Sequence, residues 1–136
     1  MQEINYEYYV SPEVAKLLKE AGFDLEVNHS YPDVSALDNQ CSGYMEDLPF
    51  YHNLNDGKYG GLSAPSLEVA QRWLREVKGY IVLVNYNEFL KTFYYSICYT
   101  KNTNRYIDDR DDCRDTSFEE AQESGIKKAL EIILEL

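Results

Sequence analysis

The hydrophobic and polar positions in the second half of the chain follow a helix–strand–strand–helix order. Apolar side chains recur at helical spacing over 66–78, and a nearly continuous apolar run follows over 80–86. Residues 93–99 then alternate with a period of two, which is typical of a strand with one buried face. A broad apolar stripe over 117–135 predicts a last helix. Folding alone therefore accounts for nearly every position of this half.

Residues at the ends of the helical patterns support these assignments. Ser11 is a good N-cap, Pro12 suits the first helical position, and Gly22 suits a left-handed C-cap, so a helix is predicted over 11–21. Two overlapping capping boxes are expected at the start of the last helix: Thr116 with Glu119, and Ser117 with Glu120.

The segment 23–64 has the least regular pattern. A short strand is predicted through Leu25, Val27 and His29. A second is predicted over 44–51, where Pro49 restricts it to the edge of a sheet. Because an irregular connection of this length is unusual in a compact domain, the segment is expected to contain either a hairpin or a functional loop.

Together these elements predict an α+β fold. We expect one small, mainly antiparallel sheet with two or three helices packed on it, in a two-layer single domain over 1–136. The helices 66–78 and 117–135 are expected on one face of the sheet. Residues 1–64 would add a helix and an acidic, Tyr-rich segment to the scaffold formed by 65–136.

The charge distribution narrows the possible partners. The formal net charge is −11, and residues 1–65 carry 11 acidic against 3 basic side chains. No cluster of Lys and Arg forms the basic face that binding to phosphate requires. Direct nucleic-acid binding and docking on an anionic membrane are therefore disfavoured, whereas a basic protein partner is compatible with this charge.

Localisation is predicted from what the sequence lacks. The first ten residues show neither the basic nor the apolar region of a signal peptide, and no apolar run approaches bilayer length. Cys41, Cys98 and Cys113 are odd in number and scattered, so they form no disulfide framework. The sequence predicts a cytoplasmic protein.

Catalytic and metal-binding patterns are weak. The histidines are His29 and His52, and Cys41 lies between them without a known catalytic or zinc spacing. The acidic run 108–115 departs from a calcium loop, since Arg114 occupies the place of the required Gly. Trp73 falls on an apolar helix face and is expected in the core. We therefore predict no catalytic, metal or cofactor site.

The order of the segments resembles a family of small uncharacterised proteins. Three blocks carry the resemblance: SPEVAKLLKEAGFD, APSLEVAQRWLREVKG and SFEEAQESGIKKALEIIL. The family is encoded by Bacteroidetes genomes, often in prophages and other mobile elements. The resemblance spans nearly the whole chain and is weakest over 32–62. It implies a mobile-element context and carries over no activity, cofactor or site residue.

The leading functional hypothesis is a non-enzymatic module that binds a host or phage protein. Tyr suits protein contacts because it joins an apolar ring to a polar tip. The predicted interaction surface consists of aromatic residues of the first half: Tyr31, Tyr44, Phe50, Tyr51 and Tyr59. One alternative is an acidic decoy that occupies a host nucleic-acid-binding protein. Another is a small enzyme or ligand binder that uses His29, Cys41 or His52.

Overall fold

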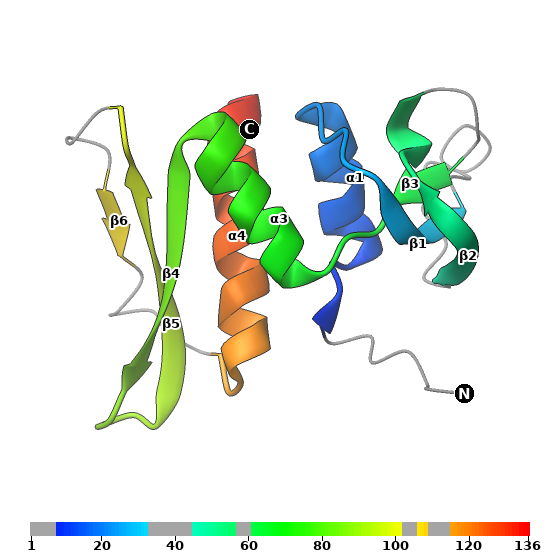
Figure 1. Ribbon diagram of the computed structural model, residues 1–136. Coiled ribbons are helices and arrows are strands. Elements are labelled where there is room, and N and C mark those ends of the chain that lie inside the picture. The colour runs from blue at the N-terminus through cyan, green and yellow to red at the C-terminus, as the bar shows by residue number, and fades with distance from the viewer. Residues whose placement is uncertain (1–7, 33–44, 57–60, 102–105, 109–114) are drawn as a thin grey trace. The chain divides into compact units, whose positions relative to one another are not determined.

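The protein forms two compact units, which divide between Ser66 and Leu67 (Figure 1). The computed structural model describes residues 8–32, 45–56, 61–101, 106–108 and 115–136. Each unit contains a three-stranded antiparallel sheet and helical segments, so the predicted α+β class is confirmed. The sequence analysis expected one sheet, and the described residues form two.

Helix α1 (Pro12–Glu20) of the first unit begins and ends as its sequence predicts. The N–H of Val14 donates to the Ser11 hydroxyl oxygen at 3.3 Å, and this side-chain cap satisfies one free amide of the first turn. Gly22 adopts φ +94°, and the N–H of Phe23 donates to the Leu18 carbonyl at 2.9 Å. This six-residue closure satisfies a carbonyl of the last turn.

The first sheet has β1 (Val27–Pro32) at its centre, between β2 (Glu46–His52) and β3 (Gly61–Ser63). Val27 pairs with His52, whereas His29 pairs with Asp47, so the register shifts between them. The shift coincides with Pro49, which has no N–H for a ladder bond. A bulged edge strand is where such a residue is tolerated, and the predicted edge position of this strand is confirmed.

Hydrogen bonds from side chains join the segments of the first unit. The amide of Asn55, in the 3-10 turn η2 (Leu54–Asp56), donates to the Phe23 carbonyl at 3.0 Å. Its side-chain oxygen accepts from the N–H of Ser63 at 3.2 Å. The hydroxyl of Tyr31 donates to the Val10 carbonyl at 2.6 Å. These bonds satisfy backbone groups between α1 and β1, at the end of β3 and in the lead-in to α1.

The second unit follows the predicted helix–strand–strand–helix order and adds a short strand. Helix α3 (Leu67–Trp73) continues into a π-helical turn, η3 (Leu74–Lys78). The left-handed Gly79 closes this turn by donating to the Leu74 carbonyl. The hairpin β4 (Tyr80–Asn87) and β5 (Thr92–Tyr99) follows, and β6 (Tyr106–Asp108) pairs with β5.

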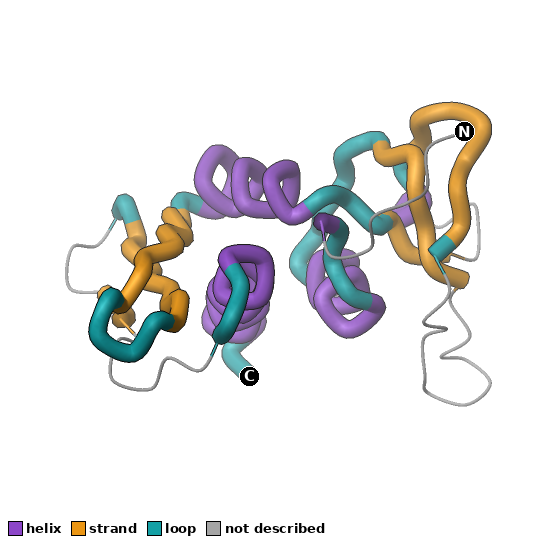
Figure 2. The backbone as a smooth tube through the Cα atoms, turned by 90° about the horizontal axis from the view of Figure 1, so that it is seen from below, coloured by secondary structure: helices purple, strands orange, loops and turns teal. Residues whose placement is uncertain are grey.

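Helix α4 (Phe118–Leu134) packs on the β4–β5 hairpin (Figure 2). The Ser117 hydroxyl accepts from the N–H of Glu120 at 3.1 Å, as one predicted capping box requires. The Glu120 carboxylate accepts from the N–H of Thr116, one residue before the expected position. The large apolar side chains that are buried in the second unit include Trp73, Leu74, Val82, Ile97, Ile126 and Leu130.

A polar bridge fixes α3 within the second unit. The side-chain amide of Gln71 donates to the Val82 carbonyl of β4, and its oxygen accepts from Gln122 of α4 at 2.7 Å. Gln122 is buried, so this bond satisfies an amide that water does not reach. We expected both long helices on the sheet face. In the structure α4 contacts both hairpin strands, whereas α3 packs against α4 and reaches β4 through Gln71.

No helix in the described part of the chain is long and apolar enough to cross a membrane.

Candidate functional site

The predicted aromatic surface is only partly described by the structure. Tyr31 is 3% exposed and hydrogen-bonded to Val10, so it belongs to the core and its assignment to a surface was wrong. Tyr51 is 65% exposed on the edge strand β2. Phe50 lies on the same strand, but its side chain is outside the described residues, as are Tyr44 and Tyr59. Of the five, Tyr51 is thus the residue that the structure places at the surface.

His29 forms the centre of a small cluster with Asp47 and Tyr9. Its ring lies on β1 and is buried, and its Nε2 faces the Asp47 carboxylate across the strand pair at 3.3 Å. The ring of Tyr9 covers it, with the two ring centroids 4.4 Å apart. Tyr9 is positioned by an antiparallel bridge to Ser66. The arrangement therefore joins the lead-in to α1 with two strands of the first sheet.

The outer part of this cluster is exposed. The Asp47 side chain is 72% exposed, whereas that of His29 is 8% exposed. Electrostatic interactions connect Tyr9 with both Asp47 and Tyr51. We call Tyr9, Asp47 and Tyr51 the β2 patch. It consists of one carboxylate and two phenol rings, a combination that accepts hydrogen bonds and can offer an aromatic face to a cation.

Burial raises the pKa of the Tyr9 phenol above its ordinary value, and the neighbouring Tyr51 and Asp47 raise it further. Replacing Asp47 by asparagine removes a negative charge that opposes ionisation of Tyr9. We therefore expect Asp47→Asn to lower the pKa of Tyr9, measured by NMR titration of the ring carbon that bears the hydroxyl.

The raised pKa of Tyr9 also determines how its contribution to the stability of the fold depends on pH. Because the folded pKa of Tyr9 is raised, its contribution to stability is fully present below the unfolded pKa and is lost as the pH rises through the folded pKa. An unchanged Tyr9 titration in Asp47→Asn would contradict the placement of Asp47 beside Tyr9.

The alternative function as a small enzyme or ligand binder required a shared site for His29, Cys41 and His52. His52 pairs with Val27, so the residue opposite His29 is Asp47 rather than His52. Cys41 lies outside the described residues. Among the residues that the structure describes, none hydrogen-bonds to the buried Nδ1 atom of His29. A general base must reach a substrate proton, and the buried His29 ring faces a carboxylate and the protein interior instead.

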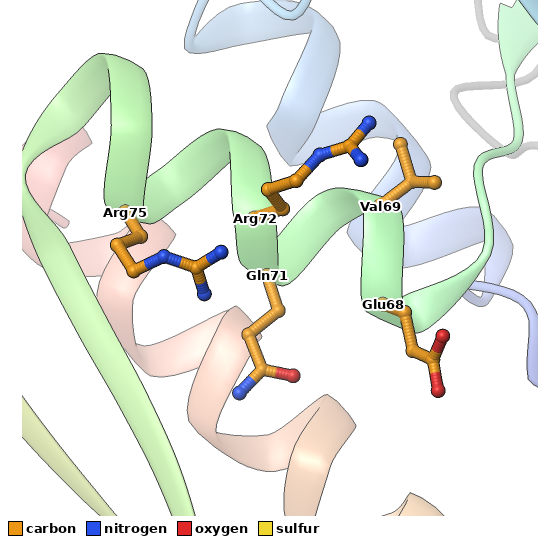
Figure 3. A pocket seen from close by; sticks show the side chains of 5 residues that line it. All are labelled: Glu68, Val69, Gln71, Arg72 and Arg75. Carbon is orange, nitrogen blue, oxygen red and sulfur yellow. The ribbon is translucent and has the colours of Figure 1, made fainter.

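A shallow pocket lies on the second unit along α3 and the start of η3. It has a volume of about 350 Å³ and is lined by five residues of this helical segment (Figure 3): Glu68, Val69, Gln71, Arg72 and Arg75. Gln71 already bridges β4 and α4. The exposed Arg72 and Arg75 follow Glu68 along the helix, so charges of both signs line this pocket. This mixture favours a solvated helix face rather than a dedicated anion site.

The acidic run before α4 shows no metal site in its described part. Residues 109–114 lie outside the described ranges. Within those ranges, no group of three or more His, Cys, Asp or Glu side chains is arranged to hold a metal ion. Burial and the nearby Glu120 raise the pKa of the Asp115 carboxyl, and a hydrogen bond from Ser124 partly opposes the shift. Glu120 itself binds the backbone of Thr116.

Sequence reasoning did not select Tyr9 or Asp47. The sequence near the N-terminus does not indicate which Tyr ring would face a histidine. Asp47 lies in a strand that was predicted, and its pairing with His29 depends on the register shift near Pro49. A shift of this size cannot be obtained from the period of the pattern alone.

Comparison with known proteins gives no family and no structural relative: no family model, curated protein or solved structure matches this chain.

Proposed function

We propose that this protein is a non-enzymatic protein-interaction module whose β2 patch binds a basic segment of a partner protein. The observation that carries the proposal is a pair of exposed side chains on one edge strand, the Asp47 carboxylate and the Tyr51 ring, which both interact electrostatically with Tyr9. A guanidinium group can pair with such a carboxylate and stack on an aromatic ring at the same time. An ammonium group can make the same two contacts with less geometric definition.

Two features of the cluster favour recognition over catalysis. His29 is held beneath Asp47 at 3.3 Å and covered by Tyr9, so it supports the patch from below. This support limits the freedom of the Asp47 side chain, and preorganisation lowers the cost of binding. The acidic charge of the chain adds a long-range attraction for a basic partner, and this attraction weakens as salt rises.

The biological setting is proposed on the resemblance to the mobile-element family. It would make the partner a host or phage protein and place the interaction in the cytoplasm. A decoy for a nucleic-acid-binding protein is a special case of the same chemistry, because such proteins present basic surfaces.

An NMR titration tests the proposal with a defined probe. A short peptide containing two arginines is compared with the same peptide containing citrulline, which has a similar shape but no charge. We expect the arginine peptide to shift the signals of Tyr9, Asp47 and Tyr51, and the citrulline peptide to leave them nearly unchanged. The shifts should decrease as salt is raised.

Two outcomes would reject the proposal. Equal shifts with both peptides would mean that charge plays no part in recognition. Shifts from the arginine peptide that fall on acidic residues of the second unit, with none in the β2 patch, would place the binding surface elsewhere.

A further inference from the structure

We propose that the free edge of β4 pairs with β4 of a second copy of this chain and forms a symmetric antiparallel dimer. Pairing would join the β4–β5–β6 sheets of two copies into one continuous sheet. This inference does not rest on the proposed function, because β4 belongs to the second unit and the β2 patch to the first.

The ladder between β4 and β5 determines which backbone groups face the free edge. The N–H of Thr100 donates to the carbonyl of Gly79, the residue before β4, at 2.8 Å. In an antiparallel ladder, alternate residues bond to the neighbouring strand and the others face away. Four residues of β4 therefore direct their N–H and C=O groups to the free edge: Tyr80, Val82, Val84 and Tyr86.

One part of this edge is already closed. The carbonyl of Val82 accepts from the side chain of Gln71, which agrees with its outward direction. Within the described residues, the outward N–H and C=O groups of Val84 and Tyr86 have no partner on this edge. A row of backbone donors and acceptors is satisfied best by another strand, so the chemistry of the edge specifies a β-strand as its occupant.

The other strand edges carry the features that prevent pairing, and β4 lacks them. The edge strand β2 contains Glu46, Asp47 and Pro49, and the described β3 and β6 are three residues long. Charges, proline and short length are the usual protections of an edge. By contrast, β4 has eight residues, YIVLVNYN, without charge or proline. This uncharged strand brings no like charges face to face in a chain of net charge −11.

Because Gln71 occupies the carbonyl of Val82, the partner strand is expected to pair with the part of β4 that follows Val82. Pairing centred on Asn85 places Val84 opposite the partner's Tyr86, and each of these pairs exchanges two N–H···O bonds. Leu83 and Tyr86 are 51% and 54% exposed, and pairing would cover part of both side chains. A pair formed by an aromatic and a β-branched residue adds to the stability of such a ladder.

Sedimentation of the full chain from micromolar to millimolar concentration tests the dimer. The mass should rise from 15.9 kDa towards twice that value. Tyr86→Lys places two positive charges near the symmetry axis and should weaken the dimer about tenfold or more. The matched control is Tyr106→Lys, because Tyr106 is 58% exposed on the opposite edge strand β6. Circular dichroism confirms that each variant is folded.

A monomer at every concentration overturns the proposal. So does an equal loss of dimer in the two variants, or a loss caused by Tyr106→Lys alone. Hydrogen exchange of the wild-type chain gives a second readout that needs no variant. The amides of Val84 and Tyr86 should become protected as concentration rises, while those of Leu83 and Asn85, which face β5, should be protected throughout. Exchange at Val84 and Tyr86 that does not depend on concentration contradicts the interface.

Discussion

Trp73→Ala is expected to lower the free energy of unfolding by about 3–5 kcal/mol, the cost of truncating a large core aromatic residue. Trp73 is 2% exposed and stands at the junction of α3 and η3. The Lys78 ammonium group also lies over its ring, 5.5 Å from the ring centre, in a cation–π contact. Truncation leaves a cavity that rigid neighbours fill only in part. Because the chain has a single Trp, urea unfolding must be followed by circular dichroism rather than by tryptophan fluorescence.

Two matched variants separate the cavity from other effects. Tyr106→Ala removes an aromatic ring that is 58% exposed and should change stability by about 0.5 kcal/mol or less. Lys78→Ala removes the cation while leaving the ring in place, and should cost about 0.5–1 kcal/mol. If Trp73→Ala costs no more than Tyr106→Ala, Trp73 is not a core residue of the folded chain.

Gly125→Ala is expected to destabilise the protein although alanine is the better helix former. A Cβ atom at position 125 would lie 2.5 Å from a methyl carbon of Val82 and 3.0 Å from the Cβ of Tyr95. Overpacking of this kind typically costs about 1–3 kcal/mol, against a gain of about 1 kcal/mol in helix propensity. We therefore expect a net loss, measured by urea unfolding, because the stiff Val82 side chain is buried and cannot move aside.

A double-mutant cycle with Val82→Ala tests the physical reason. Shortening Val82 provides space for the new methyl group, so the double variant should be less destabilised than the sum of the single variants. Lys128→Ala is the control on the same helix, since Lys128 is exposed. If the losses of unfolding free energy in the two single variants simply add in the double variant, α4 does not approach Val82 as closely as the space around Gly125 indicates.

The elements with local signals were predictable from sequence. Ser11 and Gly22 bound α1 where expected, and Ser117 caps α4 through the N–H of Glu120. The apolar run and the alternating segment became β4 and β5 with nearly the expected bounds. In each case the deciding interaction lies within a few residues along the chain, so periodicity and capping rules suffice.

The elements that depend on distant partners were not predictable. The strands β3 and β6 have three residues each, too few for a period to be recognised, and both form by pairing with a longer strand. The formation of two sheets rather than one is likewise a question of pairing. Tyr31 is buried in β1, and its hydroxyl is satisfied inside the core by the Val10 carbonyl, 21 residues earlier in the chain.

The β2 patch also depends on contacts between residues that are distant in the sequence. The sequence indicated that an acidic, aromatic segment of the first half was the place to search, and Tyr51 of that segment is exposed. Asp47 and Tyr9 join it through the cross-strand pairing of Asp47 with His29 and the contact of the Tyr9 and His29 rings. Neither contact has a local signature, because one arises from the irregular register and the other from the lead-in to α1.

The affinity of the arginine peptide for matched charge variants tests the central claim, that the β2 patch is a binding surface. Asp47→Asn and Asp24→Asn each remove one exposed acidic charge from the first unit, and Asp24 lies between α1 and β1. We expect Asp47→Asn to weaken binding about three- to tenfold, since a hydrogen bond to a charged group at an exposed site contributes on the order of 1 kcal/mol. Asp24→Asn should leave the affinity nearly unchanged. Equal weakening by both variants would show that the peptide responds only to net charge, and would contradict a binding site at the β2 patch.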